Sequence, residues 1–266
     1  MPTRSSTTTA LSGRHALVTG ASSGLGADFA RELAGRGAGL TLVARREDRL
    51  RALQRELAAA GADVRVVALD LNEPGAPDRL AAGAEADGLP VDVLVNNAGF
   101  GLYGPFSELD WERERAMLEL DMIVPVHLTK LFLPGMLARR AGWILNIASI
   151  GAYQPSPLYA SYSAAKSFIL NFTEALSYEL RGSGVVATAL SPGIVATEFR
   201  QVAGQRTTRY QRMVMMDSPT VVRLGVDALL KGRPSLVPGR LNAASVWANR
   251  LLPRRASAAL AHRLMV

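Results

Sequence analysis

Residues 16–26 read ALVTGASSGLG, an apolar run that leads through a glycine-rich turn into a helical pattern. Glycines at 20, 24 and 26 permit a tight turn, and they let backbone N–H groups approach a pyrophosphate, which the positive end of a helix favours. The spacing G-x-x-x-G-x-G differs from the more usual G-x-G-x-x-G, but its position after a first strand strengthens the interpretation. This stretch predicts an α/β fold that binds a dinucleotide at its first turn.

Strand and helix patterns alternate from this turn onward. Short apolar runs predict strands at 16–18, 40–43, 64–69, 91–95, 143–147, 185–190 and 236–237. Helical patterns occupy 24–36, 47–60, 77–87, 110–140, 159–181 and 218–231, with bends expected at Pro125 and Pro134, and with Ser218 expected as an N-cap before Pro219. Runs that are apolar throughout are typical of parallel strands covered on both faces. We therefore expect a single doubly wound domain with a mostly parallel, seven-stranded sheet flanked by helices.

Three regions follow from composition along the chain. Residues 1–12 are polar and are expected to form a flexible tail, and residues 13–240 should form the domain, with a substrate loop at about 197–217. Residues 241–266 form a basic amphipathic extension, broken at Pro253. This extension could pack on the domain, on a partner subunit or on an anionic membrane surface, in that order of preference.

Composition excludes several kinds of chemistry. The chain of 266 residues has no cysteine, which excludes disulfides, thiolate metal sites and a cysteine nucleophile. Its three histidines lack metal-ligand spacing, so no metal is expected. The start lacks the apolar segment of a secretory signal, and no apolar run reaches the roughly 18 residues of a membrane span, so a cytoplasmic protein is expected.

The formal net charge of +7 is concentrated near the C-terminus. From Phe199 onward there are twelve Lys and Arg residues against two acids. No aromatic interleaving accompanies this charge, so it indicates a solvated basic face or an anionic ligand rather than nucleic-acid binding.

A second stretch, SIGAYQPSPLYASYSAAK at 149–166, carries candidate catalytic groups. Tyr162 and Lys166 are four residues apart, so on a helix they share one face. The ammonium group is expected to lower the pKa of the phenol towards the working range of a proton donor. Ser149, at the end of a predicted strand, adds a hydroxyl that can hydrogen-bond a substrate oxygen.

The end of the second strand indicates which dinucleotide is bound. An acidic residue there would bind the ribose 2′-hydroxyl of NAD, but the chain has Ala44 followed by Arg45 and Arg46. Arginine suits a 2′-phosphate through charge-assisted contacts, so NADP(H) is the expected cofactor. Residues 20–24 also match the G-x-S-x-G nucleophile elbow, with His262 downstream, which keeps a serine hydrolase as a distant alternative.

Together these segments resemble the classical short-chain dehydrogenase/reductase superfamily. The resemblance rests on TGASSGLG at 19–26, Asp70, NNAG at 96–99, Ser149, Tyr162-x-x-x-Lys166 and SPGIVAT at 191–197. It implies a Rossmann-type core and an oxidoreductase that interconverts a carbonyl and an alcohol, with Tyr162 as general acid/base. It also implies that Ser149 orients the carbonyl and that Lys166 holds the nicotinamide ribose.

The resemblance gives a full set of expected cofactor contacts. Asp70 and Leu71 should lie near the adenine, and the segment from Pro192 to Thr197 should embrace the nicotinamide end. The complete set comprises Gly20, Ser22, Ser23, Gly24, Leu25, Gly26, Arg45, Asp70, Leu71, Asn96, Ala98, Gly99, Tyr162, Lys166, Pro192, Gly193, Ile194 and Thr197.

One position departs from the family pattern. Members of this family usually carry an asparagine in the fourth helix that supports a proton-relay water, and here that position is Asp121. An aspartate could hold the water and make the relay depend on pH, or its backbone carbonyl could act alone. The departure also keeps open a non-catalytic NADP(H) sensor as the alternative function.

The expected substrate is a small, apolar carbonyl or alcohol compound. Three segments, 100–106, 152–158 and 197–217, are expected to line its cleft with Phe100, Leu102, Tyr103, Tyr153, Phe199, Met213, Met215 and Met216. A 3-oxoacyl thioester, a steroid-like ketone and an aldehyde remain open. The family resemblance also implies a homodimer or homotetramer.

Overall fold

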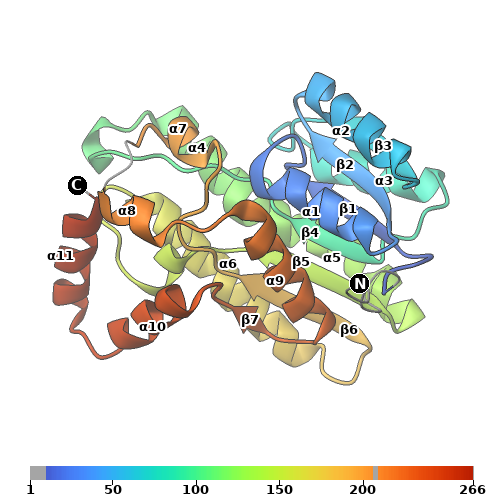
Figure 1. The fold of residues 1–266 in the computed structure, drawn as a ribbon. Coiled ribbons are helices and arrows are strands. Elements are labelled where there is room, and N and C mark those ends of the chain that lie inside the picture. The colour runs from blue at the N-terminus through green and yellow to red at the C-terminus, as the bar shows by residue number, and fades with distance from the viewer. Residues whose placement is uncertain (1–9, 206–208, 266) are drawn as a thin grey trace, which may run out of the picture.

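The computed structural model describes residues 10–205 and 209–265, and within these ranges all seven strands form one parallel sheet (Figure 1). The strands are β1 (His15–Thr19), β2 (Gly39–Ala44), β3 (Val64–Ala68), β4 (Val93–Asn96), β5 (Gly142–Ile147), β6 (Val185–Leu190) and β7 (Ser235–Leu236). Their order in the sheet is β3-β2-β1-β4-β5-β6-β7. The order reverses between β1 and β4, which is where a doubly wound fold binds its ligand. The predicted fold class is confirmed, and the sheet is wholly rather than mostly parallel.

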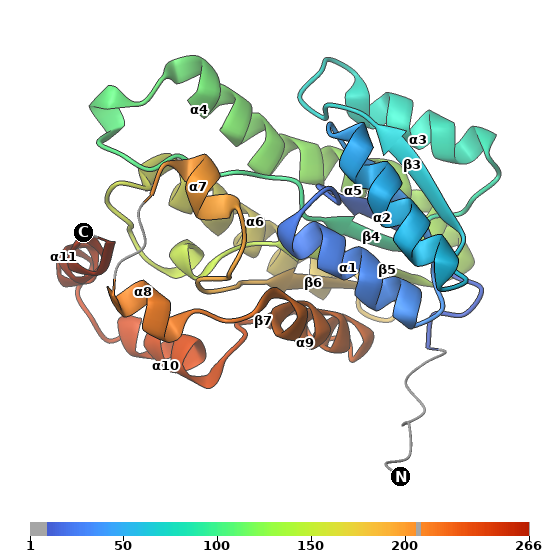
Figure 2. The ribbon, with the colours of Figure 1, turned by 45° about the horizontal axis from the view of Figure 1, so that its top comes forward.

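Helices cover both faces of this sheet (Figures 1 and 2). One face packs against α1 (Gly24–Gly35), α2 (Glu47–Ala59) and α9 (Ser218–Leu230). The other packs against α3 (Ala76–Ala86), α5 (Val124–Arg139) and α6 (Ala160–Glu179). The remaining elements are η1 (Phe106–Glu108), α4 (Trp111–Leu118), η2 (Glu119–Ile123), η3 (Ile150–Tyr153), α7 (Phe199–Ala203), α8 (Arg209–Val214), α10 (Arg240–Asn249) and α11 (Arg254–Met265).

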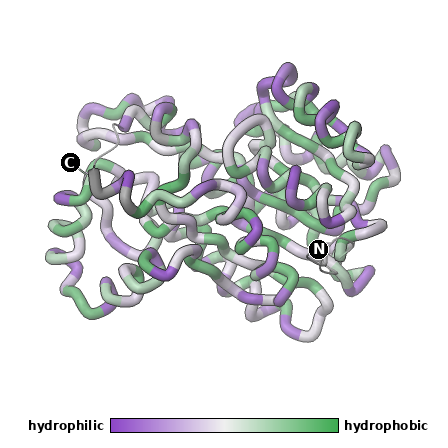
Figure 3. Tube along the Cα trace, viewed as in Figure 1, coloured by the Kyte–Doolittle hydropathy of each residue, from purple (hydrophilic) through white to green (hydrophobic). Residues whose placement is uncertain are grey.

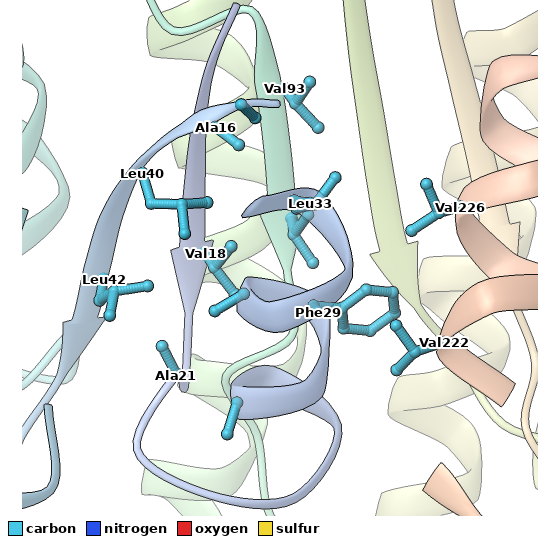
Figure 4. Close-up of a cluster of buried hydrophobic side chains, with 14 of the residues drawn as sticks. Ala16, Val18, Ala21, Phe29, Leu33, Leu40, Leu42, Val93, Val222 and Val226 are labelled. Atoms are coloured by element: carbon cyan, nitrogen blue, oxygen red, sulfur yellow. The ribbon is translucent and has the colours of Figure 1, made fainter. Parts of the chain in front are cut away.

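The contact between α1 and α9 joins distant parts of the chain. The ring of Phe29 on α1 is fully buried and lies beside Val222 and Val226 of α9, as Figure 4 shows. At the far end of the same contact, the guanidinium of Arg36 lies 2.7 Å from the Asp227 carboxylate. Burial of this apolar surface is the main stabilising contribution of the α1 face.

The predicted helix at 110–140 is divided by a π-helical turn. α4 begins after Asp110, whose side chain accepts a hydrogen bond from Arg113 N, and η2 (Glu119–Ile123) separates it from α5. Pro125 has no N–H, so the Asp121 carbonyl lacks the donor that a regular α-helix would direct to it. Pro134 lies inside α5. The turn therefore interrupts the helix at Asp121, the position that departs from the family pattern.

Two further expectations need correction. The N-cap of α9 is Asp217 rather than Ser218, because the Asp217 carboxylate accepts the N–H of Thr220 at 2.9 Å. The flexible tail predicted for residues 1–12 lies mostly outside the described residues, but Leu11 is buried and its N–H donates to the Arg36 carbonyl. The folded part therefore begins before Gly13.

The C-terminal extension forms two helices, α10 and α11, that are separated at Pro253 as predicted. Both lie at the end of the molecule away from α2 and α3 (Figures 1 and 2). None of the helices within the described ranges is sufficiently long and apolar to cross a bilayer.

Candidate active site

The glycine-rich turn joins β1 to α1. Gly20 and Gly24 both have positive φ, +67° and +53°, and a Cβ at Gly26 would overlap the Gly20 carbonyl oxygen. Ser23 occupies the N-cap of α1, but its side chain does not cap the helix, and the first turn contains no acid. The first N–H groups of α1 are therefore left for an anionic ligand.

Side-chain hydrogen bonds link this turn to the end of β4. The Thr19 hydroxyl accepts the N–H groups of Asn97 and Ala98, each at 3.0 Å, and the Asn97 amide donates to the Thr19 carbonyl at 2.9 Å. These bonds hold together the two strand ends on either side of the order reversal. Thr19 and Asn97 were absent from the predicted site residues, although both lie within the quoted motifs.

The side chain of Asn96 has hydrogen-bond partners inside the fold. Its amide donates to Asn146 Oδ1 at 2.8 Å, and the Asn146 amide donates to the Thr173 hydroxyl at 2.8 Å. All three side chains are buried. The Asn96 side chain thus belongs to a polar network that connects β4 and β5 to α6, and its expected contact with the cofactor stays a prediction.

The two arginines after β2 point in different directions. Arg46 donates to the hydroxyl of Ser23 at 2.7 Å and to that of Ser22 at 3.1 Å. Arg45 is 71% exposed and lies 3.7 Å from the Asp70 carboxylate. Arg46 therefore reaches the glycine-rich turn, whereas Arg45 was the arginine in the predicted contact set.

A carboxylate from the substrate side meets Arg46 and a second arginine, Arg49. Glu198 lies 3.2 Å from Arg46 and 2.8 Å from Arg49 of α2, and these partners lower the pKa of Glu198. Thr197 lies beside the turn, since a Cβ at Gly24 would be 3.2 Å from its side chain. Thr197 and Glu198 therefore contact the glycine-rich turn and the arginines beside it, and the expected contact of Thr197 with the cofactor stays a prediction.

Ser149, Tyr162 and Lys166 come together beyond the carboxyl end of β5. The Ser149 hydroxyl accepts the Gly151 N–H at 3.1 Å and hydrogen-bonds the Tyr162 phenol. Lys166, one turn further along α6, is buried and donates to the Ile147 carbonyl at 3.1 Å. The predicted triad is therefore assembled by one strand end and one helix.

Asp121 forms the fourth member of this group and is fully buried. Its Oδ1 accepts the Phe100 N–H at 3.2 Å, and its Oδ2 lies 3.3 Å from Lys166 Nζ without a well-aligned hydrogen bond. Burial raises the pKa of Asp121, while Lys166 opposes the rise. The π-helical turn thus places a carboxylate, rather than an amide, against the lysine.

The pKa of Tyr162 moves opposite to the predicted direction. Burial raises it most, the Asp121 carboxylate raises it further, and the hydrogen bond from Ser149 opposes both. Lys166 Nζ lies 5.7 Å from the centre of the Tyr162 ring but only 3.3 Å from Asp121. The ammonium charge is therefore largely compensated by Asp121, and the phenol keeps its proton to higher pH than a free tyrosine.

An aromatic row extends from Tyr162 across the predicted substrate side. Consecutive ring centres of Tyr103, Tyr159, Tyr162 and Phe199 lie 5.3, 5.5 and 5.4 Å apart. The Tyr159 hydroxyl donates to Gln205 at 3.0 Å. Tyr103 and Phe199 were predicted to line the substrate site, whereas Tyr159 and Gln205 were missed because only the tertiary fold brings them to Tyr162.

Other predicted substrate residues lie elsewhere. Met216 pairs through its backbone with Ile194 and Ala196, and its sulfur is within 3.7 Å of the Asn242 amide on α10. It therefore anchors the segment at 194–196 to α10, a packing role rather than the expected place in the substrate cleft. Tyr153 borders a separate cavity of about 310 Å³ beneath α10. The Met213 side chain lies outside the described residues.

The geometry does not favour the hydrolase alternative. The Ser22 hydroxyl accepts hydrogen bonds from Arg46, and His262 lies on α11, at the end of the molecule remote from α1 in Figure 1. Among the described residues, no group of three or more His, Cys, Asp and Glu side chains is arranged to hold a metal ion.

Comparisons with known proteins agree with this geometry. The profile of the short chain dehydrogenase family matches residues 14–208. An uncharacterized oxidoreductase of Myxococcus xanthus is 35% identical over 224 residues, covering 84% of this chain and 86% of that protein. A very-long-chain 3-oxoacyl-CoA reductase of Anas platyrhynchos is 35% identical over 198 residues, covering 72% of this chain but only 62% of the length of that relative.

A solved structure extends the likeness to three dimensions. The short-chain dehydrogenase from Sphingobium yanoikuyae in complex with NADPH superposes with a TM-score of 0.80 and 28% sequence identity, covering 90% of this chain and 94% of that one. Family match, relatives and fold all agree with the motifs around Tyr162. The chain is therefore an oxidoreductase that belongs to the short-chain dehydrogenase family.

Proposed function

We propose that this protein is an NADP(H)-dependent carbonyl reductase or alcohol dehydrogenase in which Tyr162 is the general acid and base. The observation that supports this proposal most directly is the assembly of Ser149, Tyr162 and Lys166 beside the glycine-rich turn. A hydroxyl, a phenol and an ammonium group at the carboxyl edge of a parallel sheet are the groups that carbonyl reduction requires.

The residues present fit an NADP(H) molecule. The uncapped first turn of α1 would hold the pyrophosphate, and Arg46, supported by Ser22 and Ser23, would meet the 2′-phosphate. Asp70 and Leu71 remain the proposed adenine contacts, and the segment at 192–197 the proposed nicotinamide contact. When bound, the cofactor supplies or accepts the hydride.

Side chains of the protein hold and donate the proton. Because the pKa of Tyr162 is raised, its phenol is protonated at neutral pH and can donate to a carbonyl oxygen that Ser149 orients. Lys166 holds its ammonium group between the Ile147 carbonyl and Asp121.

The aromatic row supports an apolar substrate. Tyr103, Tyr159 and Phe199 present ring surface next to Tyr162, which suits a hydrocarbon chain or a fused ring system rather than a sugar or an amino acid. Several relatives are named as very-long-chain 3-oxoacyl-CoA reductases, so 3-oxoacyl thioesters stand first among the proposed substrates.

The test is NADPH consumption against a panel of aldehydes, ketones and 3-oxoacyl thioesters, with Tyr162→Phe beside the wild type. Loss of the phenolic proton is expected to lower turnover by roughly 10²–10⁴-fold while NADPH still binds. Tyr178→Phe is the matched control, because Tyr178 is an exposed tyrosine on the same helix. Equal turnover in Tyr162→Phe and wild type would disprove the proposed role.

A sensor remains the second candidate, favoured by one observation. The Asp121 carboxylate sits against Lys166 and raises the pKa of Tyr162, which works against phenolate formation. Tight NADPH binding without reduction of any carbonyl in the panel would move this candidate ahead.

The expected homo-oligomer stays a prediction, supported by exposed Trp111, Ile123 and Phe168 on the α4, η2 and α6 segments.

A further inference from the structure

The C-terminal helices present an unusual outer surface. Three large apolar side chains in this short segment are exposed to water: Leu241 at 75%, Trp247 at 63% and Leu251 at 72%. Leu252 and Leu260 are also exposed. We refer to the outward sides of α10 and α11, together with residues 250–253 between them, as the C-terminal surface (Figure 2). A cluster of this kind on a folded protein indicates contact with another molecule or a membrane.

α10 combines buried polar contacts with exposed large apolar side chains. Asn242 is buried and donates to the Pro238 carbonyl at 3.0 Å, and Asn249 donates to the Tyr153 carbonyl at 3.1 Å. Leu241 and Trp247 are exposed, and Trp247 also borders the cavity beneath the helix. A surface helix in water normally buries its large apolar side chains, so the exposed ones on α10 are available to an apolar environment.

Arginines surround these apolar side chains, and the C-terminal segment itself carries no acid, although Glu174 of α6 borders the cavity beneath α10 together with Trp247 and Arg250. The five arginines of α10, α11 and their connection are exposed: Arg240, Arg250, Arg254, Arg255 and Arg263. The sequence contains no Asp or Glu after Asp227. Figure 3 shows the resulting alternation of hydrophobic and hydrophilic residues along both helices.

This charge distribution distinguishes between two kinds of occupant. In a two-fold dimer the same surface meets itself, so a contact centred here would bring arginines of one copy close to those of the other. An anionic bilayer instead offers phosphates to the arginines and an apolar layer to Trp247 and the leucines. Charge complementarity therefore favours the bilayer.

We propose that the C-terminal surface docks the protein onto an anionic phospholipid membrane. Trp247, Leu241 and Leu251 enter the boundary between headgroups and acyl chains, at a depth of about 5–10 Å, while the flanking arginines contact lipid phosphates. The docked helices lie in the plane of the membrane and do not span it.

Docking at this surface also places the substrate side next to the membrane. The last turn of α11 reaches the aromatic row, where the Tyr103 hydroxyl donates to the Met265 carbonyl at 3.3 Å. Gln205, the partner of Tyr159, lies 3.6 Å from the Met265 sulfur. A lipid-like substrate would thus have a short path from the bilayer to Tyr162. The docking itself requires neither cofactor nor catalysis.

The experiment is co-sedimentation of the full-length protein with vesicles of phosphatidylcholine, either alone or mixed with phosphatidylglycerol. We expect binding to the mixed vesicles, weak binding to the neutral ones, and release at high salt. Trp247→Ser with Leu251→Ser is expected to reduce partitioning by at least roughly tenfold. Replacement of Arg250, Arg254 and Arg255 by Glu is expected to reduce it by roughly fivefold or more per position.

Matched control variants test whether vesicle binding depends on the C-terminal surface. Replacing Arg51, Arg79 and Arg115 by Glu makes the same change in net charge on α2, α3 and α4, and should leave most of the binding intact. Trp247 fluorescence should shift to the blue on the mixed vesicles, and this shift should persist in Trp111→Phe but vanish in Trp247→Phe. Circular dichroism and NADPH binding verify that each variant is folded.

Two results would overturn the proposal. One is equal partitioning of the wild type and the Trp247→Ser, Leu251→Ser variant. The other is a dimer in light scattering that dissociates in this variant while no vesicle binding is seen, which would assign the C-terminal surface to a second copy of the chain.

Discussion

The cofactor side and the substrate side of this protein are built in different ways. On the cofactor side, backbone groups at the ends of β1 and β4 are fixed by short-range turns and by Thr19 and Asn97. On the substrate side, Tyr103, Tyr159 and Phe199 are positioned by side-chain contacts to segments far along the chain. The cofactor side tolerates few substitutions because backbone atoms form it. The substrate side can adjust to a substitution by rotating side chains.

Replacing one glycine on each side is expected to reveal the largest difference between the cofactor side and the substrate side, measured as NADPH affinity. Gly26→Ala places a methyl group against the Gly20 carbonyl, so the turn itself must move, and NADPH affinity should fall by roughly a hundredfold. Gly101→Ala places its methyl 2.7 Å from the end of the Phe199 ring, which can rotate, so NADPH affinity should be unchanged. Fluorescence titration with NADPH measures both.

Gly83→Ala serves as the control for these substitutions, because a Cβ at Gly83 would meet nothing within 4 Å. If Gly101→Ala weakened NADPH binding as much as Gly26→Ala does, the distinction between a rigid and an adjustable side would be wrong.

Replacing Arg46 or Arg45 tests which of these two arginines on the cofactor side selects NADPH over NADH. Arg46→Ala removes the group that hydrogen-bonds Ser22 and Ser23, and should weaken NADPH binding by roughly 10- to 100-fold with little effect on NADH. Arg45→Ala should have a smaller effect, because Arg45 is largely exposed and lies beside Asp70. The measurement is the ratio of the NADPH and NADH dissociation constants. A greater loss of NADPH selectivity in Arg45→Ala would restore the assignment made from the sequence.

Asp121 lies between the cofactor side and the substrate side, and its replacement should have the smallest effect on turnover. Asp121→Asn removes a carboxylate that raises the pKa of Tyr162, so that pKa should fall and the alkaline limb of the reduction profile should move to lower pH. Turnover at the optimum should stay within a few-fold, because the π-helical turn and the Tyr162, Ser149 and Lys166 side chains remain. The measurement is kcat across pH.

Glu119→Gln is the control for Asp121, since it removes one carboxylate from the same turn at an exposed position. A profile that does not move in Asp121→Asn, or that moves equally in Glu119→Gln, would remove Asp121 from the account of proton transfer.

The sequence was most informative where function depends on local spacing. The glycine-rich turn, Ser149 after a strand, and Tyr162 four residues before Lys166 are all set by one element or by the junction of two. The choice between Arg45 and Arg46 could not be made, because neighbouring residues after a strand point in different directions according to the exact path of the loop. The sequence favoured the wrong direction for the Tyr162 pKa because it did not show that the phenol is buried, which raises the pKa most, or that Lys166 of α6 lies against Asp121 of η2.

Contacts from the last third of the chain were the least predictable. Gln205 falls within the predicted substrate segment 197–217, but its contact with Tyr159, like that of Met265 with Tyr103, depends on the tertiary fold. The sequence predicted an amphipathic segment at α10, but the side of this helix that faces the protein is set by Asn242 and Asn249 finding carbonyl partners.

The packing of α1 on α9 also has a consequence for how the protein is made. The Arg36–Asp227 contact spans 191 residues, and Val222 and Val226 cover Phe29 at a similar separation. At about 5–20 residues per second, a ribosome needs roughly 10 to 40 s between synthesising the two partners. Throughout that interval α1 can already pack on β1 and β2, but the part of α1 that faces α9 lacks its native partner, so the native cover of Phe29 is complete only once α9 emerges.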